Sequence, residues 1–193
     1  MKVKVGVSNR HVHLCKEDFD VLFSGEEFYS IKDLSQKGEF MSNLKVTIKT
    51  EKGIIEGVRV VGPLRSRTQV EISMTDAYKL GIEAPIRLSG DLDGACDIML
   101  SSSNGEVNAK NSCIIAKRHL HVGSEEANEL GLNSNMTVQA LINNERGGIL
   151  FDIPVRVKDN FTLELHLDTD EANALNLKNG DIVDIEEEFY GQE

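Results

Sequence analysis

The chain has 193 residues, of which 40% are hydrophobic and 27% are charged, and its formal net charge is −11. This length is enough for one domain of good size or two small ones, each with its own core. The negative charge argues against sequence-independent binding to nucleic acid or to an anionic membrane surface, because the like charges repel each other.

The N-terminus and the cysteines bear on location. Residues 1–10 contain no apolar run, so we expect no signal peptide, and no stretch approaches the ~20 apolar residues of a membrane span. The three cysteines, Cys15, Cys96 and Cys113, form no CxxC pair. An odd count without a secretory signal suits a reducing compartment, and we expect a cytoplasmic protein without a membrane partner.

The first elements are a strand, a pair of histidines and a helix. Residues 2–8 alternate valine with lysine or glycine, which predicts a half-buried strand that leads into His11-Val12-His13. Residues 16–23 carry apolar side chains at helical spacing, with acidic residues near the N-terminal end, where the helix dipole favours them. The less patterned residues 24–42 predict a long loop.

Short strands dominate the rest of the chain, separated by turn residues and three further helices. In chain order we predict strands at 44–50 and 54–61, a short strand ending at Glu71, a helix at 74–82, short strands within 86–100, a strand at 113–117, a helix at 124–132, strands at 136–142, 148–157 and 161–165, a helix at 168–177, a strand at 181–185 and an acidic tail from Glu186.

A hidden repeat organises these elements. His13, Glu71, His121 and His166 each end a predicted strand, and an acidic residue follows five positions later and a leucine nine positions later. His11-Val12-His13 and His119-Leu120-His121 carry one additional histidine each. The simplest interpretation is an internal duplication that gives a pseudo-twofold molecule. The run 101–105 is the most linker-like, so we predict two halves, residues 1–95 and 96–193.

The histidines and Glu71 suggest a metal site. Residues i and i+2 of a strand point to one face, so His11 projects with His13, and His119 with His121. Imidazole and carboxylate suit zinc and its first-row neighbours. The six candidate ligands are too many for one tetrahedral ion, whereas two ions with open positions would suit catalysis. We list them as His11, His13, Glu71, His119, His121 and His166.

Plainer interpretations compete with this one. A single His-x-His on a strand is most often an exposed or hydrogen-bonded pair, and only the two matched copies favour a metal site. Arg10 and Arg118 are interpreted as ion-pair partners, whereas for Arg65 and Arg67 structural and functional roles are equally supported. Cys15 is interpreted as structural, because the equivalent positions of the other repeats hold no cysteine.

Four segments together resemble the phosphate propanoyltransferase family, the PduL-type phosphotransacylases, over nearly the whole chain. They are Ser8-Asn9-Arg10-His11-Val12-His13-Leu14, Gly62-Pro63-Leu64-Arg65 with Thr68-Gln69-Val70-Glu71-Ile72-Ser73, Arg118-His119-Leu120-His121, and His166-Leu167-Asp168-Thr169-Asp170-Glu171-Ala172-Asn173.

The resemblance implies a mostly β fold with short helices: two pseudo-symmetric β-barrel halves capped by α-helices, with two zinc ions between them. It implies reversible transfer of a short acyl group, acetyl or propanoyl, between coenzyme A and inorganic phosphate. It also implies a homo-oligomer, with a dimer favoured. Family members packed into microcompartments carry an N-terminal extension, whereas the core strand here begins at Lys2, so we expect no encapsulation.

The resemblance also implies roles for individual residues. One zinc would be bound by His11 and His13, and Arg65 would contact phosphate, as would Arg156 at a second position. Lys32 and Arg59 would contact coenzyme A. The second zinc would be bound by a set of four residues, Glu71, His119, His121 and His166.

Two other functions fit the same residues. A dinuclear zinc hydrolase would use metal-bound hydroxide on an ester, although the bridging motifs of that class are missing. A metal-stabilised binding module would have closed coordination and no affinity for coenzyme A. The sequence does not determine which acyl chain is preferred, because one methylene group changes binding by only ~1 to 3 kcal/mol.

Overall fold

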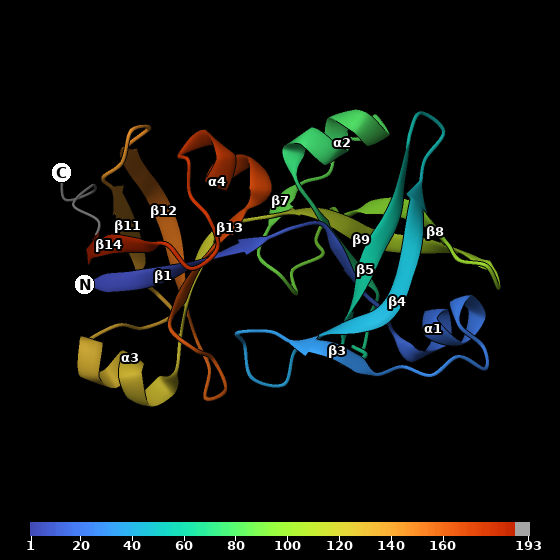
Figure 1. Ribbon diagram of the computed structural model, residues 1–193, viewed down its shortest axis with the longest axis horizontal. Coiled ribbons are helices and arrows are strands. Elements are labelled where there is room, and N and C mark those ends of the chain that lie inside the picture. The colour runs from blue at the N-terminus through green and yellow to red at the C-terminus, as the bar shows by residue number, and fades with distance from the viewer. Residues whose placement is uncertain (188–193) are drawn as a thin grey trace. The chain divides into compact units, whose positions relative to one another are not determined.

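The computed structural model describes residues 1–187, and the remainder of the predicted acidic tail lies outside this range. The chain forms two compact units (Figure 1). Unit 1 contains residues 1–8 and the chain from residue 118 onward, and unit 2 contains residues 9–117. Among the described residues, no helix is long and apolar enough to cross a membrane.

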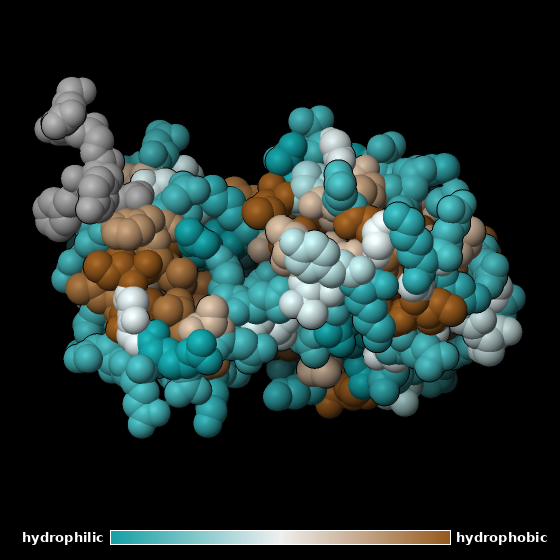
Figure 2. Space-filling view, turned by 90° about the horizontal axis from the view of Figure 1, so that it is seen from above, coloured by the Kyte–Doolittle hydropathy of each residue, from teal (hydrophilic) through white to brown (hydrophobic). Residues whose placement is uncertain are grey.

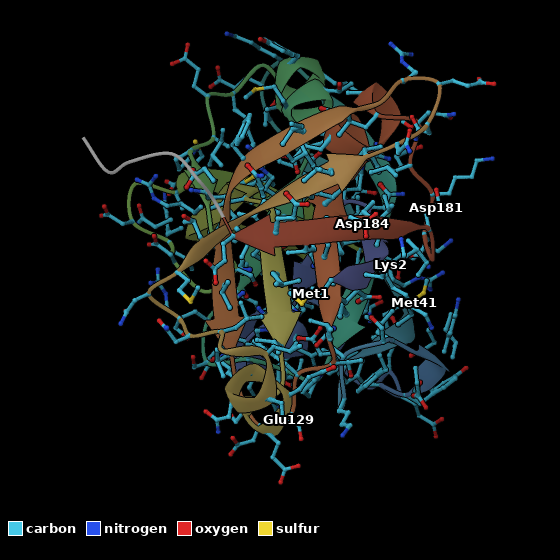
Figure 3. All side chains as sticks on the ribbon, turned by 90° about the vertical axis from the view of Figure 1, so that its left-hand side faces the viewer. Met1, Lys2, Met41, Glu129, Asp181 and Asp184 are labelled. Atoms are coloured by element: carbon cyan, nitrogen blue, oxygen red, sulfur yellow. The ribbon has the colours of Figure 1, made fainter. Side chains whose placement is uncertain are left out.

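Unit 1 is a closed six-stranded barrel in the order β1-β13-β10-β12-β11-β14. Lys2 and Asp184 form an ion pair of 3.1 Å on the outer surface where β1 meets β14 (Figure 3). Its elements are β1 (Lys2–Ser8), β10 (His119–Val122), α3 (Ser124–Leu130), β11 (Thr137–Ile142), β12 (Gly148–Val157), β13 (Glu164–Asp168), α4 (Thr169–Ala174) and β14 (Ile182–Glu187).

Unit 2 contains a second closed barrel, because β4, β5, β2, β6, β9 and β8 pair in a ring. Two short strands, β3 and β7, pair with β4 and β9 outside this ring. Its elements are β2 (His11–His13), α1 (Lys16–Leu22), β3 (Ser30–Asp33), β4 (Phe40–Lys49), β5 (Ile54–Gly62), β6 (Gln69–Ile72), α2 (Met74–Leu80), β7 (Ile86–Arg87), β8 (Cys96–Ser101) and β9 (Glu106–Ala116).

The two barrels have the same pairing pattern, which confirms the predicted fold of two similar barrel halves with short helices. In each, the His-x-His strand is antiparallel to one neighbour and parallel to the other: β2 lies between β6 and β5, and β10 lies between β13 and β12. The next strand along each barrel also corresponds: β9 lies parallel to β6 in unit 2, and β1 lies parallel to β13 in unit 1. The duplication seen in the sequence is therefore a duplication of topology.

The compact units differ from the predicted halves 1–95 and 96–193. β1 closes the barrel of unit 1 although it precedes β2 in the chain, and β9 closes the barrel of unit 2 although it precedes β10. The supposed linker is the turn of the β8–β9 hairpin, where the Ser102 amide donates to the Gly105 carbonyl at 3.0 Å. Each repeat thus contributes its first strand to the other barrel.

Several strands alternate buried and more exposed residues because one face lines the barrel interior, whereas β6 and β10 are buried at every position. In β1, for example, Val3 and Val5 are buried whereas Lys2 and Lys4 are exposed. Each barrel has its own apolar core, and the largest fully buried side chains include Leu14 in unit 2 and Leu165 in unit 1. The face seen in Figure 2 is largely hydrophilic, with apolar side chains gathered in places.

All four predicted helices are present, each directly after a strand that carries a candidate ligand. The residues two positions after these ligands are the helix N-caps: Cys15, Ser73, Gly123 and Asp168. Ser73 and Asp168 form capping boxes, in which the side chain accepts from the backbone three residues later. One prediction needs correction: residues 24–42 are not one loop, because β3 and the start of β4 lie within them.

Candidate metal centres

The first group of candidate ligands lies in unit 2 and joins two strands. His11 and His13 project from β2 while Val12, between them, is fully buried in the core. Glu71 on β6 is the direct cross-strand partner of His11, and His11 Nε2 lies 3.7 Å from Glu71 Oε2. One ligand atom from each of the three residues lies within 4.8 Å of the others. Antiparallel pairing thus brings together residues 60 positions apart in the chain.

A hydrogen-bond network supports this group. Gln69 Nε2 donates to Glu71 Oε1 at 2.5 Å and to Ser89 Oγ at 2.9 Å, and the Gly90 amide donates to Gln69 Oε1 at 2.8 Å. Arg65 Nη1 donates to the same Ser89 hydroxyl at 3.2 Å, and Arg65 Nη2 contacts Glu39 Oε1 at 3.0 Å. Arg65 is therefore linked to the ligand group through a buried glutamine and a serine.

Burial and charge set the protonation states of the unit 2 group. Burial lowers the pKa of His13 well below its ordinary value, and the neighbouring His11 and Arg65 charges act in the same direction. For Glu71, burial would raise the pKa, but electrostatic interactions with His11, His13 and Arg65 and a hydrogen bond from Ser89 hold it below the ordinary value. A neutral imidazole and an ionised carboxylate are the protonation states that a metal ion requires.

The second group lies in unit 1 and uses three imidazoles. His119 and His121 project from β10, and His166 on β13 is the cross-strand partner of His119. The ring centroids are 4.4 to 5.0 Å apart, and one nitrogen from each ring lies within 4.8 Å of the others. His166 therefore occupies the position in unit 1 that Glu71 occupies in unit 2.

An aromatic ring and two cations border the unit 1 group. The Phe161 ring stacks on His121, with ring centroids 3.8 Å apart and an interplanar angle of 21°. Arg156 on β12 is the cross-strand partner of His121. The Arg156 guanidinium carbon and the Lys158 ammonium nitrogen lie 5.7 and 5.3 Å from the centroid of the Phe161 ring. Burial lowers the pKa of His121, and the charges of His119, His166, Arg156 and Lys158 lower it further. His121 is thus held neutral beside a positively charged rim.

Both groups fit a transition metal. Among residues 1–187, no hydrogen-bond partner reaches Nδ1 of His13 or either ring nitrogen of His121, although these atoms are buried. Burying a polar atom without a partner is unfavourable, so a metal ion that accepts one lone pair from each ring would reduce the penalty. Two sets of three nitrogen and carboxylate ligands match zinc with a position left open.

The grouping of Glu71 differs from the one implied by the resemblance. That expectation placed Glu71 with His119, His121 and His166, whereas the structure places it with His11 and His13. The reason is the strand pairing of unit 2, in which β6 lies directly beside β2. The local sequence around Glu71 contains no signal for this register.

The other predicted residues have more varied surroundings. Arg59 on β5 is the cross-strand partner of His11, and its Nη1 donates to the Ser42 carbonyl at 2.8 Å. Lys32 is exposed on β3. Arg67 is also exposed, and its Nη2 donates to the Asn111 carbonyl at 3.4 Å. The structure therefore gives Arg59 a place beside the unit 2 group, and Arg67 no contact with it.

The residues interpreted as structural behave as expected. Arg10 pairs with Asp76 at 2.7 Å, and Arg118 pairs with Glu171 at 2.6 Å. Both acids are the fifth residue after a candidate ligand, so the two repeats use equivalent ion pairs. Cys15 belongs to neither ligand group of the described residues.

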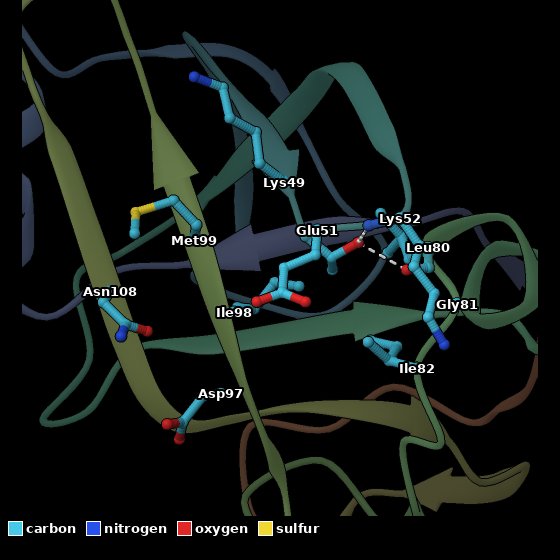
Figure 4. Close-up of a pocket in the computed structure, with 11 residues that line it drawn as sticks. Lys49, Glu51, Lys52, Leu80, Gly81, Ile82, Asp97, Ile98, Met99 and Asn108 are labelled. Carbon is cyan, nitrogen blue, oxygen red and sulfur yellow. Dashed lines mark hydrogen bonds between the residues drawn. The ribbon is translucent and has the colours of Figure 1, made fainter.

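A hollow lined by Lys49, Lys52, Ile82 and Met99, among others, lies in unit 2 between the β4–β5 hairpin, the end of α2 and strands β8 and β9 (Figure 4). Thr50 and Leu80 also line it, and Thr50 Oγ1 donates to the Leu80 carbonyl at 2.6 Å. Its lining includes none of the predicted site residues.

Comparison with known proteins identifies the family. The profile of the phosphate propanoyltransferase family matches residues 4–178. This chain belongs to the phosphate propanoyltransferase family. It is 46% identical over 185 residues to the phosphate propanoyltransferase of Thermotoga maritima, covering 95% of this chain and 88% of that protein. The phosphate propanoyltransferase of Shewanella putrefaciens is 42% identical, covering 94% of this chain and 86% of that protein. The one of Levilactobacillus brevis is 44% identical, covering 91% and 85%.

Sequence reasoning missed several residues that border these phosphate propanoyltransferase ligand groups. Gln69 and Glu164 each lie two positions before the third ligand of their group, so the strand period could have pointed to them. Phe161, which stacks on His121, and Lys158, which lies over the Phe161 ring, come from the loop after β12, for which no pattern was available. Ser89 reaches the network from the segment after β7.

Proposed function

We propose that the chain is a zinc-dependent phosphate acyltransferase. It transfers a short acyl group, acetyl or propanoyl, reversibly between coenzyme A and inorganic phosphate, and binds two zinc ions, one at each ligand group. The observation that carries this proposal is the occurrence, in a member of this family, of two three-residue ligand groups, each bordered by arginine. We further propose that it acts in the cytoplasm as a homodimer.

In the reaction, a phosphate oxygen attacks the thioester carbonyl carbon, the carbon–sulfur bond breaks, and the phosphate proton ends on the coenzyme A thiol. Phosphate near neutral pH is already an anion, so no separate protein base is required. Bound zinc would act as a Lewis acid that stabilises the negative charge developing on the carbonyl oxygen.

Arg65 binds phosphate in this proposal. Its guanidinium matches phosphate geometry with two parallel donors, and its contacts with Ser89 and Glu39 hold the side chain in place. Its positive charge offsets the repulsion between phosphate and the anionic coenzyme A. Orientation of two anions that water would keep apart supplies much of the rate acceleration.

Arg156 offers a second anion contact at the unit 1 group, where it lies beside His121. Lys32 and Arg59 contact coenzyme A in this proposal. Arg59 is half-buried next to His11, whereas Lys32 is exposed, as a residue that meets the outer part of a long substrate would be.

The test is a thiol-release assay with acetyl-, propanoyl- and butanoyl-coenzyme A on protein of measured metal content. Release should require phosphate, and removal of metal by a chelator should abolish it until zinc is restored. Full activity in verified metal-free protein would refute the metal requirement. Release with water alone at the same rate would favour the zinc hydrolase, and no release with any substrate would favour the binding module.

A further inference from the structure

The two ligand groups correspond position by position, and this correspondence includes one residue behind each group. In unit 2 the residue two positions before the third ligand is Gln69, which pairs across the strands with His13. In unit 1 the equivalent residue is Glu164, which pairs with His121. Gln69 donates to Glu71, and Glu164 contacts His166, so each group has a polar residue bonded to its third ligand.

Glu164 is held against His166 with little freedom. Its Oε2 lies 2.8 Å from His166 Nε2, and the residue is only 8% exposed. On the neighbouring strand β1, the register partner of His166 is Gly6. A Cβ atom at Gly6 would lie 2.7 Å from Glu164 Cδ, so the carboxylate in its present position packs directly against the Gly6 backbone and would have to shift if a side chain were added there.

The carboxylate occupies a different position in each of the two groups. Unit 2 has Glu71 as the third ligand and a neutral amide behind it, whereas unit 1 has His166 as the third ligand and a carboxylate behind it. Each group thus combines one carboxylate with two or three imidazoles. Of the described residues, Glu164 is outside the set whose ligand atoms lie within 4.8 Å of one another.

We propose that Glu164 is a positioning residue for His166. Its carboxylate accepts the Nε2–H of His166, which fixes the ring orientation and the tautomer and leaves Nδ1 as the nitrogen that carries a lone pair. A carboxylate behind a metal-bound histidine raises the basicity of the ligand and strengthens metal binding. This inference rests on the proposed binding of zinc at the unit 1 group and assigns it a supporting residue.

The first test measures zinc affinity by competition with a chromophoric chelator in the full-length protein. Glu164→Ala should lower the affinity for one of the two zinc ions by about 10- to 100-fold and leave the affinity for the other unchanged. Glu164→Gln keeps a hydrogen-bond acceptor for Nε2–H and should lower the affinity for that ion by a smaller factor. Asp184→Asn is the matched control, because it removes a carboxylate of the same unit from the outer surface, where Asp184 pairs with Lys2 (Figure 3).

Two outcomes of this test would overturn the proposal. One is unchanged affinity for both ions in folded Glu164→Ala protein. The other is an equal, severe loss in Glu164→Ala and Glu164→Gln, which would make Glu164 a direct ligand. Thermal unfolding of each variant without metal checks that it is folded.

A second measurement needs no variant. Imidazole nitrogen chemical shifts of the metal-free wild-type protein report the tautomer of His166, and we expect the proton on Nε2. A proton on Nδ1 would contradict the proposal. Because this measurement uses neither zinc nor substrate, it tests the Glu164–His166 contact even if the proposed acyl transfer proves wrong.

Discussion

Arg65 and Arg67 are two positions apart, and the sequence alone supports structural and functional roles equally for both. Their surroundings in the structure differ. Arg65 is half-buried, contacts Ser89 and Glu39, and influences the charge state of the unit 2 ligand group. Arg67 is exposed and donates only a long hydrogen bond of 3.4 Å among the contacts described. This difference makes the two arginines a matched pair for testing the proposed phosphate contact.

We expect Arg65→Ala to raise the KM for phosphate by roughly 10- to 100-fold, because a charge-assisted hydrogen bond contributes about 1.5 to 3 kcal/mol. The KM for acyl-coenzyme A should change much less. Arg67→Ala should leave both constants within about twofold. Steady-state kinetics with each substrate varied in turn provides the measurement, and an unchanged phosphate KM in Arg65→Ala would contradict the assigned contact.

The stability of the metal-free protein should depend on pH through the buried histidines. Burial lowers the pKa of His13 and His121 below the ordinary value of 6.5. Below that pH the unfolded chain takes up protons that the folded chain does not, so the free energy of unfolding should fall as the pH falls. Urea unfolding at pH of about 7.5 and about 5.5 measures the change. The double variant His13→Gln, His121→Gln should show a smaller change, and an identical pH dependence would argue against buried neutral imidazoles.

The ion pairs of the two repeats connect the residue before each His-x-His strand with the helix that follows the third candidate ligand of the same unit. Arg10 Nε donates to Asp76, which is 2% exposed and also completes the capping box of α2 with Ser73. Arg118 makes the equivalent contact with Glu171 in the capping box of α4. One carboxylate therefore fixes both the start of a short helix and the arginine before the His-x-His strand.

We expect Asp76→Ala to lower the free energy of unfolding by about 1 to 3 kcal/mol, because it removes a buried acceptor and half of a capping box. Asp20→Ala is the control, since Asp20 is exposed on α1 and, among residues 1–187, its ion-pair partner is Lys16 one turn away. Its effect should stay within about 0.5 kcal/mol. Denaturant unfolding compares the two, and equal effects would show that the buried contact has no special weight.

The exchange of first strands ties the two barrels together through the chain. β1 completes unit 1 and β9 completes unit 2, while the residues that follow each strand belong to the other unit. A substitution in β1 should therefore affect residues more than 100 positions away more strongly than its own sequence neighbours.

Val5→Ala tests this division. Val5 is fully buried in the core of unit 1, and its truncation should destabilise that barrel by roughly 2 to 3 kcal/mol. Hydrogen exchange should accelerate in β13 and β14, whereas β5 and β6 should stay protected. Val60→Ala, equally buried in unit 2, should produce the reverse pattern. Faster exchange confined to unit 2 in Val5→Ala would contradict the assignment of β1.

The sequence by itself determined the local features of this protein. Alternation in residues such as Val3 and Val5 predicts the strand, apolar spacing predicts the four helices, and the matched His-x-His copies predict the duplication and six candidate ligands. These features depend on neighbours in the chain, so periodicity and composition are enough to reveal them.

Only the tertiary structure decided which strands close which barrel, and hence which residues share a group. Strand pairing joins residues far apart in sequence, and its register depends on how two faces pack, which no local pattern records. That register places Glu71 beside His11 and His166 beside His119, and moves the boundary between units away from the apparent linker. The sequence contained the candidate ligands, and the long-range pairing of strands grouped them.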